Sequence, residues 1–170
     1  VTNALYTAVV NGSATTSNAQ YPYVNVSYTG TQSFITKLNY ATNLSFAIPT
    51  RDQWQYAAKG GNKTQNYTYS GSNTPGDVAW YAGNSGGKTH EVKQLAPNEL
   101  GIYDMSGNVE EWTSTRYNTS SSYTGNYYRC GGYYSDSESS VTKTSSRYSS
   151  SWYEYVYAEY LGIRIILICQ

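Results

Sequence analysis

Charge, histidine and cysteine are scarce in this chain of 170 residues. Eleven basic and eleven acidic residues cancel, and charged residues make up only 13% of the total. Such a balance offers no surplus charge to attract nucleic acid or an anionic membrane, so neither partner is expected. The longest apolar run, residues 163–169, is far shorter than the ~20 residues of a spanning helix. It also contains Arg164, and no membrane insertion is predicted.

Two cysteines and one histidine restrict the metal and redox chemistry that the chain can perform. Cys130 and Cys169 could form a disulfide, lie as two buried thiols or act as a reactive pair, and the sequence leaves the three possibilities open. His90 stands alone in a glycine-rich stretch, where a solvated polar residue is expected rather than a metal ligand. A serine nucleophile is not expected either, because the single histidine would have to serve as its base. We therefore predict no catalytic residue and no cofactor.

Tyrosine and serine are the residues that the chain has in excess. Residues 117–160 hold eleven tyrosines and twelve serines in 44 positions. Tyrosine offers a large, rigid contact face with a polar tip, and serine keeps the spaces between the rings small. This composition predicts an exposed interaction surface. The alternation of Tyr153, Tyr155 and Tyr157 leaves a second interpretation open, in which these rings are ordinary strand residues.

Two helices are predicted in the first third of the chain. A short strand around Tyr23 to Ser27 precedes a helix of roughly three turns that begins near Thr31. A second helix follows Thr50, a good N-cap that forms a capping-box pattern with Gln53. The apolar residues expected on the inner faces are Phe34, Ile35, Leu38 and Ala41 in the first helix and Trp54, Ala57 and Ala58 in the second.

The rest of the chain predicts loops and short strands. Residues 62–101 have poor periodicity and many turn-forming residues, which indicates long irregular loops. Residues 99–112 (ELGIYDMSGNVEEW) mix turn residues with apolar anchors, which predicts a turn flanked by short buried strands. The apolar residues 161–168 predict a central strand that closes against the N-terminal region.

Three segments in order carry a resemblance to a known family: IPTRDQWQYAAKGG (48–61), PNELGIYDMSGNVEEW (97–112), and CGGYY (130–134) followed by SSR (145–147) and LGIRI (161–165). They resemble the formylglycine-generating-enzyme-like branch of the C-type lectin fold, over about residues 21–167. The resemblance implies one α+β domain over residues 1–170. It also implies two helices, short twisted antiparallel strands, long irregular loops and two termini paired as neighbouring strands. The expected frame residues are Trp54, Tyr103, Met105, Trp112, Gly131, Gly132 and Gly162.

The chemistry of the enzymes in this branch is not carried over by the resemblance. Formylglycine-generating enzymes use a pair of thiols that bind copper, and the resemblance places one of the two near Thr142 or Lys143, where this chain has no cysteine. Cys130 stands where the family has an arginine, and Cys169 lies beyond the last core strand. We therefore predict a protein that is not an enzyme. An oxidoreductase of this type with lost or relocated cysteines is the alternative, and a structural tail or pilus module is a third.

The chain also resembles the variable proteins of diversity-generating retroelements, whose last loop region is rewritten by adenine mutagenesis. Codons of the AAC type become NNC, which favours the tyrosine, serine and aspartate found in residues 117–160, the expected variable region. The resemblance implies a receptor-like or adhesin-like protein on a virion or cell surface that binds an unidentified protein or cell-surface ligand. The predicted ligand-binding residues are Tyr133, Tyr134, Ser135, Asp136, Tyr148, Ser149, Ser150, Tyr153, Tyr155, Tyr157 and Tyr160.

Several side chains within residues 98–111 carry oxygen atoms, and the sequence does not decide whether they bind a metal ion. They could hold a structural calcium ion, because calcium prefers hard oxygen ligands. The favoured interpretation is that they form turns and caps. The residues concerned are Asn98, Asp104, Asn108, Glu110 and Glu111.

Overall fold

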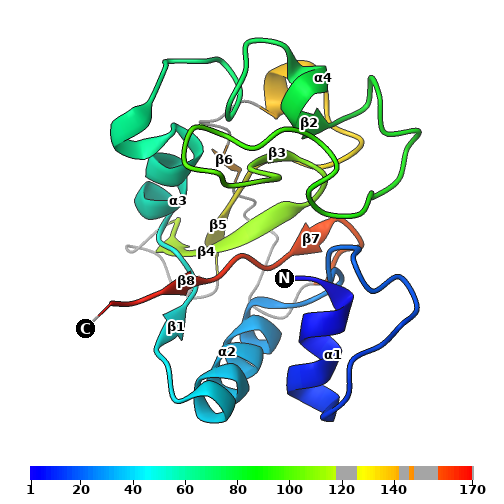
Figure 1. The fold of residues 1–170 in the computed structure, drawn as a ribbon, viewed down its shortest axis with the longest axis vertical. Helices are drawn as coiled ribbons and strands as arrows, with labels where there is room; N and C mark the ends of the chain where they lie inside the picture. The colour runs from blue at the N-terminus through cyan, green and yellow to red at the C-terminus, as the bar shows by residue number, and fades with distance from the viewer. Residues whose placement is uncertain (118–125, 142–145, 148–156, 170) are drawn as a thin grey trace.

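The computed structural model describes residues 1–117, 126–141, 146–147 and 157–169 (Figure 1). In chain order its elements are α1 (Asn3–Asn11), α2 (Tyr28–Thr42), β1 (Phe46–Ala47), α3 (Arg51–Ala58), the 3-10 helix η1 (Gly61–Lys63), α4 (Pro75–Val78), β2 (Ala79–Trp80), β3 (Ser106–Gly107), β4 (Glu110–Arg116), β5 (Tyr127–Cys130), the 3-10 helix η2 (Glu138–Ser140), β6 (Ser146–Arg147), β7 (Leu161–Gly162) and β8 (Ile166–Leu167). Figure 1 shows β4 and β7 crossing the middle of the molecule, with α1 and α2 on one side and α3, α4 and long loops on the other.

The sheets are small and of mixed direction. The largest has four strands in the order β6-β5-β4-β7, in which β4 pairs with β5 antiparallel and with β7 parallel. Two further pairs are β1 with β8, antiparallel, and β2 with β3, parallel. Three of the five pairs among the described strands are antiparallel, as expected, and the β4–β7 and β2–β3 pairs are parallel.

The two expected helices are present. α2 begins three residues earlier than Thr31, because the Ser27 hydroxyl caps it by accepting the N–H of Gly30 at 3.0 Å. Its buried face includes the expected Phe34, Ile35 and Leu38, whereas Ala41 is exposed, contrary to expectation.

α3 has the predicted capping box. The Thr50 hydroxyl accepts the N–H of Gln53 at 3.1 Å, and the Gln53 side chain accepts the N–H of Thr50 at 2.8 Å. Trp54 and Ala58 are fully buried on its inner face, and Ala57 is half-buried. α3 contacts both β4 and β5, so this helix anchors the sheet to the irregular half of the molecule.

The described residues contain four α-helices rather than the expected two. α1 is capped by Thr2 at its start and by Gly12 at its end, and packs against α2. α4 is a single turn within the region 62–101, which also holds the two-residue strand β2 and the end of η1 and is largely irregular as predicted. The turn expected within residues 99–112 lies between β3 and β4, where Gly107 and Asn108 adopt φ values of 71° and 62°.

The N-terminal amino group donates to the carbonyl of Ile163 at 2.7 Å, but the expected pair of terminal strands does not form. Instead of a strand at residues 23–27, the structure has a single bridge between Val24 and Gly162. The expected central strand at the C-terminus is also different, since β7 ends the four-stranded sheet and β8 pairs with β1 elsewhere. Leu167 and Ile168 are 49% and 50% exposed, so an apolar run that predicted burial continues onto the surface.

Three buried clusters form the core. The largest surrounds Trp112 between the sheet and α2, and a second joins Trp54 to Met105 and Cys130. A third surrounds Tyr69 and Val141 among the loops. The expected frame residues Trp54, Met105, Trp112, Gly131, Gly132 and Gly162 are all buried, and Tyr103 is half-buried.

Candidate functional site

The predicted ligand-binding residues fall into two groups. Five of them lie outside the described residues: Tyr148, Ser149, Ser150, Tyr153 and Tyr155. The other six come from two segments, residues 133–136 directly after β5 and residues 157–160 directly before β7.

Three tyrosines from these two segments form a joined aromatic group, which we call the tyrosine platform. The rings of Tyr133 and Tyr160 stack with centroids 4.3 Å apart and planes 24° apart. Tyr134 meets Tyr133 edge-to-face, with centroids 5.4 Å apart and planes 86° apart. Both arrangements are favourable aromatic geometries. The fold therefore unites residues that are 27 positions apart in the chain.

The platform lies at the surface. Tyr133, Tyr134 and Tyr160 are half-buried, and the adjoining Ser135 is exposed. Tyr157 is 61% exposed. None of the described tyrosines beyond residue 130 is buried, so these rings can reach a partner.

A second aromatic group includes Tyr6 of α1. Tyr6 of α1 stacks on Tyr23 with ring centroids 3.4 Å apart, and on Phe34 of α2 at 5.2 Å. Burial raises the pKa of Tyr6 to about 12, with smaller contributions from a hydrogen bond with Tyr23 and from the nearby Tyr157. The sequence did not indicate this stack.

Asp136 does not occupy the surface position that was expected for it. The residue is only 6% exposed, and its Oδ2 accepts the N–H of Tyr133 at 3.0 Å. A carboxylate held in this way stabilises a turn and is covered by its own loop. Asp136 is thus part of the turn, and its role as a ligand contact stays a prediction.

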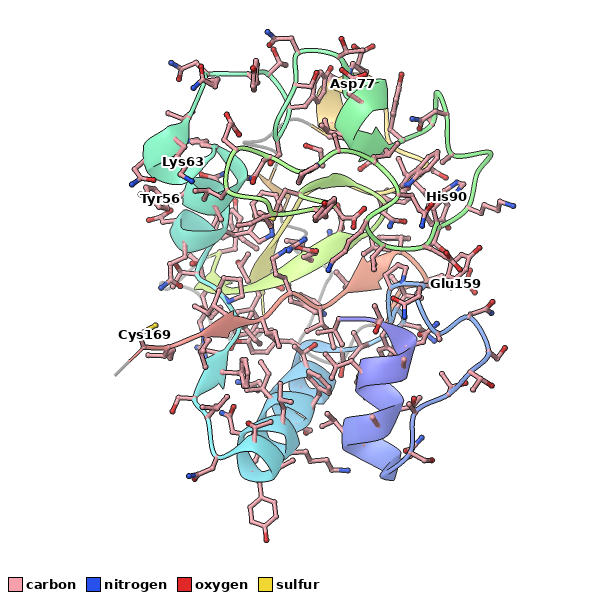
Figure 2. The ribbon with its side chains drawn as sticks, in the orientation of Figure 1. Tyr56, Lys63, Asp77, His90, Glu159 and Cys169 are labelled. Carbon is pink, nitrogen blue, oxygen red and sulfur yellow. The ribbon has the colours of Figure 1, made fainter. Side chains whose placement is uncertain are left out.

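The segment 133–136 is also fixed by Ser85 in the loop after β2 and by Asn108 directly after β3. The Ser85 hydroxyl donates to the carbonyl of Tyr134 at 2.7 Å, and the N–H of Tyr134 donates to the carbonyl of Asn108 at 3.0 Å. His90, expected to be a solvated residue, is half-buried and stacks on Trp80 with centroids 3.8 Å apart. Figure 2 shows His90 and Glu159 on the same side of the view, with Cys169 on the opposite side.

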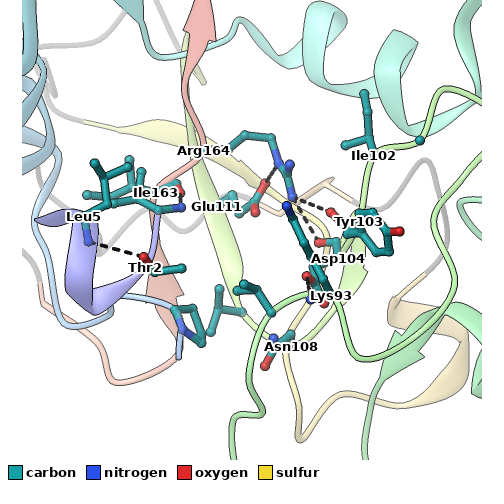
Figure 3. Close-up of a pocket in the computed structure, with 15 residues that line it drawn as sticks. Thr2, Leu5, Lys93, Ile102, Tyr103, Asp104, Asn108, Glu111, Ile163 and Arg164 are labelled. Atoms are coloured by element: carbon teal, nitrogen blue, oxygen red, sulfur yellow. Dashed lines mark hydrogen bonds and ion pairs between the residues drawn. The ribbon is translucent and has the colours of Figure 1, made fainter. Parts of the chain in front are cut away.

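A separate pocket of about 400 Å³ lies between the N-terminal residues and the start of β4 (Figure 3). Arg164 crosses its floor, where Nε lies 2.6 Å from the Glu111 carboxylate and Nη2 donates to the carbonyl of Tyr103 at 2.9 Å. None of the six described ligand-binding candidates lines this pocket. The platform and the pocket are therefore distinct features.

The possible calcium ligands all have protein partners. Glu110 pairs with Arg129 at 2.9 Å, and both are buried. Glu111 accepts from Trp54 Nε1 and Arg164 Nε, each at 2.6 Å. The side-chain oxygens of the remaining three, Asn98, Asp104 and Asn108, each accept at least one backbone N–H. These contacts support the turn-and-cap interpretation, and the described part of the chain holds no group of three His, Cys, Asp or Glu side chains suited to a metal.

Comparison with known proteins identifies the family. The model of the FGE-sulfatase family, described as the sulfatase-modifying factor enzyme 1-like domain, matches residues 5–168. The chain belongs to this family.

Relatives of the FGE-sulfatase domain differ in what their names describe. The solved structure of Treponema denticola variable protein 1 superimposes with a TM-score of 0.80 and 26% identity, covering 97% of this chain and 81% of that one. The chaperone protein LppX of Paenibacillus barcinonensis is 50% identical over 84 residues, which are 39% of this chain and 30% of that protein. The inactive Cα-formylglycine-generating enzyme 2 of Bos taurus is 29% identical over 116 residues, covering 62% of this chain and 36% of that protein. The chain thus spans about a third of the length of these curated relatives.

The C-type lectin-like fold of the formylglycine-generating-enzyme branch, inferred from the sequence motifs, is confirmed, and so is the likeness to a variable protein. Among the described residues, no helix combines the length and the apolar character needed to cross a bilayer.

The cysteines of this FGE-sulfatase domain are both free thiols. Cys130 is 1% exposed in the cluster with Trp54, and burial, followed by the charge of Glu111, raises its pKa to about 12. A thiol with so high a pKa is a poor nucleophile and a poor metal ligand. Cys169 is exposed at the far end of β8. The two therefore form neither a disulfide nor a pair of buried thiols.

Some residues around the site were not indicated by the sequence. Ser85 was not singled out among the loop serines, and in the structure it is buried and donates its hydroxyl to the carbonyl of Tyr134. On the β4–β5 pair, Tyr117 meets Tyr128 edge-to-face at 5.6 Å, and the Arg51 guanidinium lies 4.6 Å from the Tyr128 ring centre. These tyrosines lie inside the expected variable region, and the high tyrosine content of residues 117–128 was the available signal.

Proposed function

We propose that this chain is a non-enzymatic, variable ligand-binding protein that contacts its partner through exposed tyrosine and serine residues within the region 117–160. The observation that carries the proposal is the Tyr133–Tyr160 stack, which joins two tyrosine-rich segments at the surface. Its resemblance to a variable protein over 97% of the chain supports the same function.

The composition of this surface suits recognition of a partner. Each ring can contribute roughly 1.5 to 3 kcal/mol by burial of apolar area, before the entropic cost of association is subtracted. Micromolar affinity corresponds to about 8 kcal/mol, and association costs several kcal/mol more, so a larger handful of such rings is needed. The partner is a protein or another cell-surface ligand, and the setting is a virion or a cell surface.

The proposed diversification is tested by sequencing the gene and its flanks from independent isolates. We expect a near-copy of the 3′ segment that differs only where adenine stands, beside a reverse transcriptase gene. Substitutions among isolates should concentrate in codons 117–160 and include Tyr133, Tyr157 and Tyr160. Absence of both the near-copy and the reverse transcriptase, with uniform variation along the gene, would favour a structural tail or pilus module instead.

The competing function is oxidation of a peptide cysteine, suggested by the FGE-sulfatase family itself. The buried Cys130 thiol, with its pKa near 12, argues against this function. The test is to incubate the purified chain with copper and a cysteine-containing peptide and to measure aldehyde formation. No turnover is expected, and turnover that Cys130→Ser abolishes would replace our proposal with the enzyme.

A further inference from the structure

Four main-chain hydrogen bonds hold the part of the platform that follows β5. Asp136 makes two of them, accepting the N–H of Tyr133 at 3.0 Å and donating its own N–H to the carbonyl of Tyr133 at 2.9 Å. Asn108 and Ser85 make the others, accepting the N–H of Tyr134 at 3.0 Å and donating to its carbonyl at 2.7 Å. All four reach main-chain atoms of Tyr133 and Tyr134, so they do not depend on which side chains stand there.

Asn108 connects this segment to the loop that carries Ser85. Its amide brackets His90, accepting the N–H at 3.0 Å and donating to the carbonyl at 3.1 Å. The N–H of Asn108 donates to the carbonyl of Trp80 at 2.8 Å. The His90 ring then lies on Trp80, and its Nε2 is 2.8 Å from the carbonyl of Ser85. Ser85 is therefore held at a fixed place relative to the platform.

The opposite side of the segment is closely packed. Gly132 has a φ of 71°, and a Cβ there would lie 2.7 Å from the carbonyl oxygen of Ser140 and 3.0 Å from Asp136 Oδ2. Only glycine fits readily in this position. A side chain at position 132 would therefore press on the Asp136 carboxylate that accepts the Tyr133 N–H.

We propose that Ser85, Asn108 and Asp136 are positioning residues of the ligand-binding surface, which hold residues 133 and 134 so that Tyr133 remains stacked on Tyr160. The inference rests on the proposed function, and it removes Asp136 from the set of ligand contacts. A surface ordered before binding loses less conformational freedom when the partner arrives, which raises affinity. Positions 133–135 can then change side chain without losing their place.

The first readout is the stack itself, measured as the ring-proton chemical shifts of Tyr133 and Tyr160 in the folded chain. Ser85→Ala and Asp136→Ala should move these shifts toward their unfolded-chain values, while the amide signals of α3 stay unchanged. Asp136→Asn should restore the shifts, because its amide oxygen still accepts the Tyr133 N–H. Ser137→Ala is the matched control, since that hydroxyl contacts only the hydroxyls of Ser139 and Ser140.

The second readout is the affinity for a single-domain antibody that has been selected on the folded chain. Only an antibody that does not bind the Tyr160→Ser variant is used, so that its binding depends on the tyrosine platform. Ser85→Ala and Asp136→Ala should weaken its binding about tenfold, whereas Asp136→Asn and Ser137→Ala should stay within about twofold. If Asp136→Ala does not fold, Ser85→Ala decides alone.

Unchanged ring shifts, or unchanged affinity despite altered shifts, would overturn the positioning inference. Neither result would affect the gene comparison that tests the proposed function. Conversely, a gene without signs of diversification would contradict the proposed function. It would not change the ring-proton shifts expected for the Ser85 and Asp136 variants.

Discussion

Single residues show best how burial governs chemistry in this domain, and the two cysteines are the clearest case. Cys130 is 1% exposed, and Cys169 is exposed. In the native protein, a disulfide-based thiol reagent should therefore react rapidly with one thiol per chain, and with both in strong denaturant. Cys169→Ser should abolish the rapid phase. Rapid reaction that persists in Cys169→Ser would mean that Cys130 is accessible, and would revive the enzymatic alternative.

The raised pKa of Cys130 also predicts a pH dependence of stability. Its pKa is about 12 in the folded protein and 9.0 ordinarily, so between these values the unfolded chain loses a proton that the folded chain keeps. The stabilisation is present below about pH 9 and is lost as the pH rises toward 12. Relative to Cys130→Ala, wild type should lose about 2 kcal/mol of unfolding free energy between roughly pH 8 and pH 10.5, measured by urea unfolding. Cys169→Ala should show the same pH dependence of the unfolding free energy as wild type. If Cys130→Ala lost as much unfolding free energy over this pH range as wild type, the raised pKa of Cys130 would be contradicted.

At this scale the sequence predicted residue types better than residue roles. Tyr133, Tyr134 and Tyr160 were singled out by composition, and they lie together at the surface. Asp136 fits the same codon pattern, yet it is buried. Composition shows which residues a region contains. It does not show that the Asp136 carboxylate accepts the N–H of Tyr133, because that contact forms only in the folded turn.

Among the elements, α3 gives the sharpest test, because its start is fixed by the capping box of Thr50 and Gln53. Thr50→Ala removes an acceptor for an otherwise unpaired N–H and should lower the unfolding free energy by about 1 kcal/mol. Ser33→Ala in the middle of α2 is the matched control. Its hydroxyl donates only to the carbonyl of Thr29, and alanine is the better helix former, so stability should stay equal or rise slightly. Urea unfolding followed by circular dichroism measures both, and an equal effect would contradict the capping role.

The elements that could be predicted are those with local signals. α2 and α3 combine a capping residue with apolar spacing, and both formed where expected within a few residues. α1 was not predicted, and it has no fully buried residue. Its Tyr6 ring stacks on Tyr23 and Phe34, which lie 17 and 28 positions further along the chain, so a local pattern does not reveal this contact. The apolar run 161–168 predicted one central strand, and this prediction was wrong. The run has a strong local signal, but its residues divide between β7 in the four-stranded sheet and β8, where Leu167 is exposed.

The molecule as a whole divides into a buried frame and an exposed tyrosine surface. The family motifs predicted the frame because Trp54, Met105 and Trp112 are required by its packing. The contacts that support this surface could not be predicted. Ser85, Asn108 and Asp136 come from different loops, and each forms a hydrogen bond with the main chain of Tyr133 or Tyr134 only in the folded protein. Local patterns do not encode such contacts.

This division predicts different costs for the same substitution in the two parts. Tyr157 is 61% exposed, so Tyr157→Ser should change the unfolding free energy by no more than about 0.5 kcal/mol. Tyr127 is 7% exposed and stacks on Tyr28 with centroids 3.5 Å apart, so Tyr127→Ser should cost about 3 to 5 kcal/mol. Urea unfolding compares the two variants directly. A large loss for Tyr157→Ser would show that its ring supports the fold, and a ring needed by the fold is not free to change with the partner.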